Sequence, residues 1–475
     1  MTVLMGLALT ASANAAVRLP AVFSDHMVLQ SGRPVPVWGT ASANEAVTVS
    51  IAGQTKSVHA GADGKWSVTL DKLSAGKDAV SLTIKGEKSI EIKDVLIGEV
   101  WLCSGQSNMA LAVSKAKDFE KEKAAATHPG IRMFQNKWMV CDPATVGNFS
   151  AAAYFFGREI QQKLDVPVGL INCSAGGSPI EFWTSLEAQQ AVPELKPILD
   201  AGGPVATGAD AAQAESDRKQ ALEVEGKQAA GAQKRPPGYL FDNRIVPLIP
   251  YAIRGVIWYQ GEANSYTSNA YLYGRQLQTM VKDWRKRWGY DFPFIAVQLP
   301  EFGNPQKDPV EDSGRALVRD GVLQLLSLPN TGFAVTLGTG EVKSNHPQNK
   351  QEAGRRLALW ALAEAYGQKD VVPSGPLFRG HQIVGNTIVV TFDHTDGGLV
   401  AADGPLKGFA IAGADHHWVW ADAKIEGNKV ILSHPDIPSP VAARYAWAGN
   451  PQGSNLCNGS RLPASPFRTD ADGKP

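Results

Sequence analysis

The sequence predicts a three-layer α/β/α domain with a smaller β module on either side. Between residues 94 and 367, short apolar runs alternate with amphipathic helix-like segments, a pattern typical of a mostly parallel sheet covered on both faces. Before and after this region the sequence shows only short β-like runs between turn residues. The length of 475 residues also exceeds what one ordinary hydrophobic core can organise. We therefore expect two or three domains.

The chain begins with an apolar run over residues 3–11, followed by the small residues Ala13, Asn14 and Ala15. This spacing is typical of a signal-peptidase site, so we expect residues 1–16 to be a signal peptide and the protein to be secreted or periplasmic. No Lys or Arg precedes the apolar run, so a truncated leader or a buried N-terminal segment are the alternatives.

Residues 17–93 are expected to form an N-terminal β module. Runs such as 35–38 and 47–51 are rich in Val and are separated by Gly, Asn and Asp turns, without a helical period. Because Pro36 has no N–H to donate, we expect its strand to lie at an edge.

The central domain, residues 94–367, is expected to contain five buried strands, each followed by a polar, glycine-containing loop. Ligands of open α/β sheets bind beyond the carboxyl ends of the strands. An Ala- and Gln-rich stretch, about 202–235, predicts an exposed helical excursion at the entrance of the site. Residues 368–475 return to β-like runs and predict a C-terminal β module. The five predicted strands are 95–102, 168–173, 255–259, 294–299 and 333–337.

The composition excludes several classes of partner. Lys and Arg total 46 and so do Asp and Glu, and the pI is about 7.1, so we expect neither nucleic acid nor a membrane surface as a partner. We expect no metal or cofactor, because the sequence has no HExxH, paired CxxC or phosphate-binding glycine loop. Four cysteines leave either one disulfide or four buried thiols open.

A candidate nucleophile follows the first central strand. Residues 100–103 lead directly into Ser104-Gly105-Gln106-Ser107, and residues 110–113 read as a helix. This order places the Ser107 hydroxyl at a helix N-terminus, where free N–H groups can stabilise an oxyanion. A serine that merely caps the helix is the alternative.

Four blocks of the sequence resemble the sialate O-acetylesterase group of the SGNH hydrolases. The resemblance implies a flavodoxin-like α/β/α hydrolase domain with accessory β modules, and an esterase that removes acetyl groups from carbohydrate. It covers nearly the whole chain after the leader, and four blocks in order are far more specific than a single Gly-Gln-Ser. The blocks are residues 98–109, 169–181, 255–264 and 346–350.

The resemblance implies Ser107 as nucleophile and His346 as its base, and acyl transfer also needs donors for the tetrahedral oxygen. We expect the N–H groups of Ser107 and of Gly176 or Gly177 to form the oxyanion hole, with the amide of Gln260 as a third donor. A turn that merely needs positive φ is the alternative reading of the two glycines.

Further residues are expected to support these groups or to contact the sugar. Glu262 and Asn264 would hold the loop after residue 259, although a solvated loop is the alternative for Asn264. Gln106 and Asn108 flank the nucleophile. The candidates for sugar contacts are Trp183, Tyr259, Tyr266 and Asn243, with core packing as the alternative for Trp183.

The sequence departs from the family pattern before the histidine. SGNH enzymes usually carry an Asp there that orients the imidazole, whereas Lys343, Ser344 and Asn345 precede His346. Either Glu341 reaches back to the ring, or a backbone or amide group orients it in a Ser-His dyad, and we favour the dyad.

The expected reaction is hydrolysis of acetyl esters on sugars through an acetyl-serine intermediate. The near-neutral charge favours a plant cell-wall glycan, such as xyloglucan or xylan, as the acetylated oligosaccharide or polysaccharide partner. Acetylated sialic acid is one alternative. A carbohydrate-binding protein on a decayed esterase fold, a lipase and a thioesterase are others.

Overall fold

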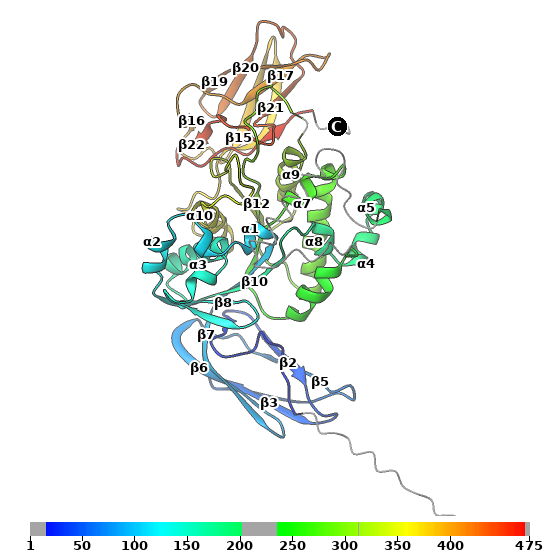
Figure 1. Ribbon diagram of the computed structural model, residues 1–475, viewed down its shortest axis with the longest axis vertical. Coiled ribbons are helices and arrows are strands. Elements are labelled where there is room, and N and C mark those ends of the chain that lie inside the picture. The colour runs from blue at the N-terminus through cyan, green and yellow to red at the C-terminus, as the bar shows by residue number, and fades with distance from the viewer. Residues whose placement is uncertain (1–15, 202–234, 312, 471–475) are drawn as a thin grey trace, which may run out of the picture.

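Three bodies follow one another along the long axis of the molecule: an N-terminal β module, a central α/β domain and a C-terminal β module (Figure 1). This computed structural model describes residues 16–201, 235–311 and 313–470. The predicted signal peptide and helical excursion fall almost entirely outside the described residues.

The central sheet confirms the predicted α/β class. Its strands lie in the order β13-β12-β11-β7-β10-β8-β9, and all neighbours are parallel except β8 and β9. The five predicted strands are present, and the antiparallel β8–β9 hairpin is an addition that the alternation did not reveal. The strands are β7 (Ser89–Gly105), β8 (His128–Phe134), β9 (Trp138–Cys141), β10 (Val168–Ser174), β11 (Gly255–Tyr259), β12 (Phe294–Gln298) and β13 (Thr331–Val335).

Strand β7 is the point at which the order of strands in the sheet reverses. Strands β8 to β10 lie on one side of it and β11 to β13 on the other. In open α/β sheets such a switch strand marks the ligand crevice, because the loops leaving it diverge on either side.

Helices lie to both sides of the sheet, with α3 and α10 together on one side and α8 and α9 on the other (Figure 1). Helix α3 begins where the Ser150 hydroxyl accepts from the Ala153 N–H, and α8 ends at Gly289, which has φ 81°. Both ends therefore follow from local sequence. The helices are α1 (Ser107–Ala110), α2 (Phe119–Ala124), α3 (Ala151–Leu164), α4 (Leu186–Gln190), α5 (Lys196–Asp200), α7 (Glu262–Ser265), α8 (Tyr273–Trp288), α9 (Gly314–Leu323) and α10 (Lys350–Trp360).

The N-terminal module shares strand β7 with the central domain. Residues of the first half of β7 pair with β1 and β6, and residues 99–105 pair with β10. The predicted boundary at 93/94 therefore falls inside one continuous strand. Strand β2, which contains Pro36, pairs with β5 alone. The strands are β1 (Val28–Gln30), β2 (Val35–Thr40), β3 (Ala46–Ile51), β4 (Gln54–His59), β5 (Lys65–Leu70) and β6 (Gly76–Lys85).

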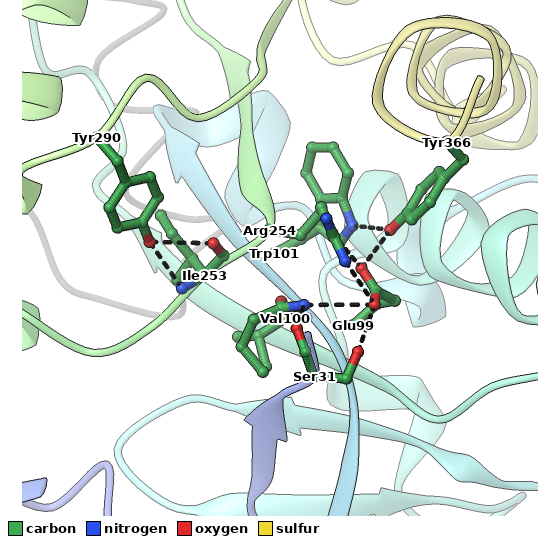
Figure 2. A network of polar contacts seen from close by, with 9 residues as sticks. Ser31, Glu99, Val100, Trp101, Ile253, Arg254, Tyr290 and Tyr366 are labelled. Atoms are coloured by element: carbon green, nitrogen blue, oxygen red, sulfur yellow. Dashed lines mark hydrogen bonds and ion pairs between the residues drawn. The ribbon is translucent and has the colours of Figure 1, made fainter. Parts of the chain in front are cut away.

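An ion pair between the buried Glu99 and the partly buried Arg254 fixes this junction (Figure 2). The guanidinium of Arg254 contacts both carboxylate oxygens of Glu99, with Nη2 3.0 Å from Oε1. The hydroxyls of Ser31 and Tyr366 donate to the same carboxylate, at 2.8 and 3.0 Å. Glu99 thus connects the N-terminal module, the start of β11 and the end of the helical segment that follows β13. Both of its carboxylate oxygens accept hydrogen bonds, so its buried charge is compensated.

The C-terminal module consists of antiparallel strands. Two four-stranded sheets have the orders β14-β15-β20-β19 and β18-β17-β21-β23. Their strands are β14 (Leu377–Val384), β15 (Thr387–Asp393), β17 (Phe409–Ala412), β18 (Trp418–Trp420), β19 (Asp422–Glu426), β20 (Lys429–Ser433), β21 (Ala442–Tyr445) and β23 (Phe467–Arg468). All four cysteines of the chain are buried free thiols. None of the helices in the described ranges is both long enough and apolar enough to cross a bilayer.

Candidate active site

Ser107 lies immediately beyond the carboxyl end of the switch strand β7. The turn depends on Gly105, which has φ 138° and lies so close to β11 that an added Cβ would be 2.1 Å from the Tyr259 carbonyl oxygen. Only glycine fits this position. Ser107 is the first residue of α1, so the N-cap position belongs to Gln106, whose side chain makes no capping hydrogen bond. The alternative that Ser107 merely caps the helix is therefore wrong.

The His346 imidazole lies beside the Ser107 hydroxyl. Nε2 is 2.7 Å from Oγ, and both side chains are buried. The histidine comes from the loop between β13 and α10, which crosses the same edge of the sheet. The structure thus brings together the two residues that the sequence predicted as nucleophile and base.

The glycine loop after β10 adjoins the nucleophile turn. Ser174 at the end of β10 is in register with Gly105, and the Ala175 N–H donates to the Gly105 carbonyl at 3.0 Å, so the glycine loop runs alongside the nucleophile turn. Gly177 has φ 62°, in the left-handed region. Among the described residues, the N–H groups of Ser107 and Gly177 have no hydrogen-bond acceptor.

Gln260 is fully buried, and its amide is already used. Nε2 donates to Oδ1 of Asn264 at 2.8 Å and to Oε1 of Gln106 at 3.1 Å, while Oε1 accepts from the Tyr273 hydroxyl at 2.9 Å. An amide has only two N–H donors, so neither is left over for a substrate oxygen in this arrangement. Gln260 instead holds the residue that precedes the nucleophile.

Buried side chains hold the loop that contains Gly176 and Gly177. Asn264 is buried, so it is not part of a solvated loop: Oδ1 accepts from the Ile180 N–H at 3.0 Å and Nδ2 donates to Glu181 at 3.0 Å. Trp183 is fully buried and donates from Nε1 to Ser178 Oγ at 2.8 Å. Ser178 in turn donates to the Ala175 carbonyl at 2.6 Å.

Asn108 connects the nucleophile turn to the histidine loop. Its Nδ2 donates to Oε1 of Glu262 at 2.5 Å and to the carbonyl oxygen of Asn345 at 2.9 Å. Its Oδ1 accepts from the Lys350 ammonium at 2.8 Å. Oδ1 of Asn345 accepts from Arg315 at 2.6 Å. The residue after Ser107 and the residue before His346 are therefore joined through one buried network.

Burial, and after it the nearby positive charges, sets the protonation state of the imidazole. Burial, together with the positive charges of Lys350 and Arg315, lowers the pKa of His346 to about 4. Burial also lowers the pKa of Lys350 to about 7 and raises the pKa of Glu262. At neutral pH the imidazole is therefore uncharged, which is the form that can accept a proton from Ser107.

Among the residues that the structure describes, no carboxylate contacts the His346 ring. Oε1 of Glu341 accepts instead from the Gln348 backbone N–H at 2.7 Å, so Glu341 orders the loop beyond the histidine rather than the imidazole. The two alternatives were a carboxylate from Glu341 on the ring and a Ser-His dyad, and the described residues match the dyad.

The remaining predicted residues divide into buried and accessible ones. Tyr259 and Trp183 are both buried in the core, so neither ring is accessible to a substrate. Tyr266 is half-buried, with its hydroxyl 3.5 Å from Nδ2 of Asn345. Asn243 is exposed and lines a cavity beside the active site. Asn243 and Tyr266 thus remain as candidates for sugar contacts.

Three residues of the network were not predicted, although two of them had a signal in the sequence. Lys350 ends the block that begins at His346, so its position was visible. Glu181 ends the second block in the same way. Arg315 lies on α9, far from any block, and only the folded chain brings it to Asn345.

A serine hydroxyl bonded to a histidine, beyond the switch strand of a parallel sheet, is the arrangement of a serine hydrolase. A family model described as carbohydrate esterase, sialic acid-specific acetylesterase, matches residues 97–199 and 242–365. The crystal structure of a carbohydrate acetylesterase from Xanthomonas citri is 34% identical, with a TM-score of 0.83, over 96% of this chain and 100% of that one. The chain belongs to this family of carbohydrate acetylesterases, which are carboxylic-ester hydrolases.

Curated relatives agree with this assignment. The sialate O-acetylesterase of Mus musculus is 28% identical over 96% of this chain and 95% of its own length. That of Homo sapiens is 27% identical over 96% of this chain and 93% of its own length. The family and the enzyme class predicted from the four blocks are thus confirmed.

Proposed function

We propose that this enzyme removes acetyl groups from a glycan through an acetyl-Ser107 intermediate. The observation that carries the proposal is the 2.7 Å contact between Nε2 of His346 and Oγ of Ser107. Since the imidazole is neutral at physiological pH, it can take the hydroxyl proton as the oxygen attacks the acetyl carbonyl.

The tetrahedral intermediate needs hydrogen-bond donors for its negative oxygen. We propose the N–H groups of Ser107 and Gly177 for this role, because neither has an acceptor among the described residues and both lie on adjoining turns. Gln260 acts by holding Gln106 beside the nucleophile.

Collapse of the intermediate breaks the bond to the sugar oxygen, which takes the proton from His346 as the sugar leaves. Water then attacks the acetyl-serine, His346 takes a proton from that water, and acetate leaves as the proton returns to Ser107 Oγ. No carboxylate is assigned to this cycle. The buried network of Asn108, Lys350 and Arg315 instead holds the histidine loop in place.

For the acetylated glycan, we propose a plant cell-wall polysaccharide such as xyloglucan or xylan, in line with the balanced charge of the chain. Acetylated sialic acid is the second candidate, and the description of the matching family favours it. We also propose export to the periplasm or the medium, on the basis of residues 1–16.

One assay tests the activity and ranks the substrates. Acetate release is measured on acetylated xyloglucan, xylan and sialic acid, for the wild type and for Ser107→Ala. We expect release by the wild type alone, with a plant glycan preferred. Equal release by both proteins would reject Ser107 as nucleophile, and none from either would indicate a binding protein. Long-chain p-nitrophenyl esters should be poorer substrates than the acetate; the reverse would indicate a lipase or thioesterase.

A further inference from the structure

A cavity of about 910 Å³ lies beside the candidate active site, at the carboxyl ends of β10 and β8. Ala110 lines it, and this residue lies three positions after Ser107 on α1, which is within one helical turn. Ser174 also lines it, two residues before Gly176. The cavity therefore adjoins both the nucleophile turn and the glycine loop.

Five carboxamide side chains dominate the polar part of this wall: Gln135, Asn136, Asn148, Asn172 and Asn243. A carboxamide both donates and accepts, so it matches neighbouring hydroxyl groups on a sugar ring. No Asp or Glu lines the cavity in the described part of the chain. The hydroxyls of a ligand would thus meet neutral partners rather than fixed negative charge.

One charged group faces the same space. Arg244 donates from Nη1 to the Ser174 carbonyl and forms no ion pair with a described carboxylate. Its other N–H donors can serve hydroxyl or carboxylate oxygens of a ligand. Phe134 and Met139, both partly exposed, supply an apolar surface of the kind on which the face of a pyranose ring packs.

We propose that this carboxamide cavity binds the sugar residues that adjoin the acetylated one, so that the substrate is an oligosaccharide or polysaccharide chain rather than a monosaccharide. The inference rests on the proposed function. An acetyl group needs only a small pocket, whereas this cavity is near the upper end of the roughly 300–1,000 Å³ found for ligand sites. Its mixed carboxamide and apolar wall suits a glycan chain.

Binding of glycans without acetyl groups tests the proposal separately from hydrolysis. Isothermal titration calorimetry compares xylose with xylotetraose, and free sialic acid with sialyllactose, as neutral and carboxylated arms. We expect at least one of the longer glycans to bind at least 10-fold more tightly than its monosaccharide. If neither does, the cavity is not a glycan subsite, whatever the outcome of the acetate assay.

Two variants show whether the cavity causes the preference. The double variant Asn148→Ala/Asn243→Ala removes two carboxamides, and Asn243→Trp fills the cavity; both positions are exposed, so the fold should tolerate them, as thermal unfolding will check. We expect both to lose the advantage of the longer glycan. Asn386→Ala, an exposed amide in the C-terminal module, is the matched control and should retain it. Wild-type preference in the first two variants would overturn the proposal.

Discussion

Nζ of Lys350 lies 2.8 Å from the side-chain oxygen of Asn108, so a buried amine at the start of α10 contacts the residue next to the nucleophile. Nothing in the described part of the chain places a carboxylate on the imidazole. The site therefore differs electrostatically from a triad: the charges that act on the base are the positive ones of Lys350 and Arg315, and they lower the pKa of the imidazole.

This difference predicts an unusual pH profile. Because the pKa of His346 is lowered to about 4, the imidazole stays unprotonated, and competent as a base, well below its ordinary titration range. We expect kcat/KM for p-nitrophenyl acetate to remain high as pH falls and to decline only near pH 4. A decline near the ordinary histidine pKa would contradict this expectation.

Lys350→Met should move that decline to higher pH. Removing the positive charge makes the imidazolium easier to form, so the pKa of His346 rises and activity is lost sooner as the medium becomes acidic. The measurement is the acid limb of kcat/KM against pH. Lys343→Met, an exposed lysine of the same loop, is the control and should leave the limb unchanged. A role of Lys350 in folding alone would change the yield of folded protein but not the position of the limb.

Ser107→Ala and His346→Gln should each lower kcat/KM for an acetyl ester by at least about 10³-fold. Combining them should cost little more than either alone, since the two groups act as a unit. Acetate release measures the effect, and unchanged thermal unfolding confirms that the loss is chemical. Additive losses would mean that the two residues act independently.

Gly105→Ala should destabilise the protein by about 3 kcal/mol or more, because it combines a positive φ with a Cβ placed 2.1 Å from the Tyr259 oxygen. Gly289→Ala is the matched comparison: it has φ 81° but no atom within 4 Å of the added Cβ. Strain alone should cost about 1–2 kcal/mol there. Urea unfolding measures both, and equal losses would show that the contact with Tyr259 is unimportant.

Arg254→Met should destabilise the junction by about 3 kcal/mol, because it leaves Glu99 buried and without its cation. Adding Glu99→Gln should restore part of the loss. Arg379→Met breaks an exposed pair with Asp393 and should change stability by less than about 0.5 kcal/mol. If Arg379→Met cost as much as Arg254→Met, burial would not be the cause.

Local patterns predicted the elements that carry their own signal. Buried parallel strands are continuous apolar runs, so β11 was predicted at its observed bounds and the other four within a few residues, apart from the N-terminal half of β7. The helix expected over 110–113 was wrong: α1 ends at Ala110, and residues 113–115 form a 3-10 turn. Helical propensity over so few residues is too weak to fix a helix against its surroundings.

Site residues could be predicted where they lie within one of the four sequence blocks. They could not be predicted where only the fold brings them to the site. Ser107 and His346 lie in blocks, and the structure places them in contact. Arg315 and most of the cavity wall come from segments outside the blocks, although residues 171–174 of the wall belong to the second block. Tyr259 lies within a block and Trp183 lies just after one, but their positions in the sequence could not show that their rings face inward.

The continuity of β7 has a consequence for how this enzyme can be divided. A cut at residue 94 would separate the first half of that strand from the half that leads to Ser107, and would strip away the neighbours β1 and β6. The N-terminal β module is thus not an independent domain that can be removed. Its removal would leave the backbone of residues 95–98 without these partners, directly before the segment that presents the nucleophile, so a shortened protein should aggregate rather than act as a minimal esterase.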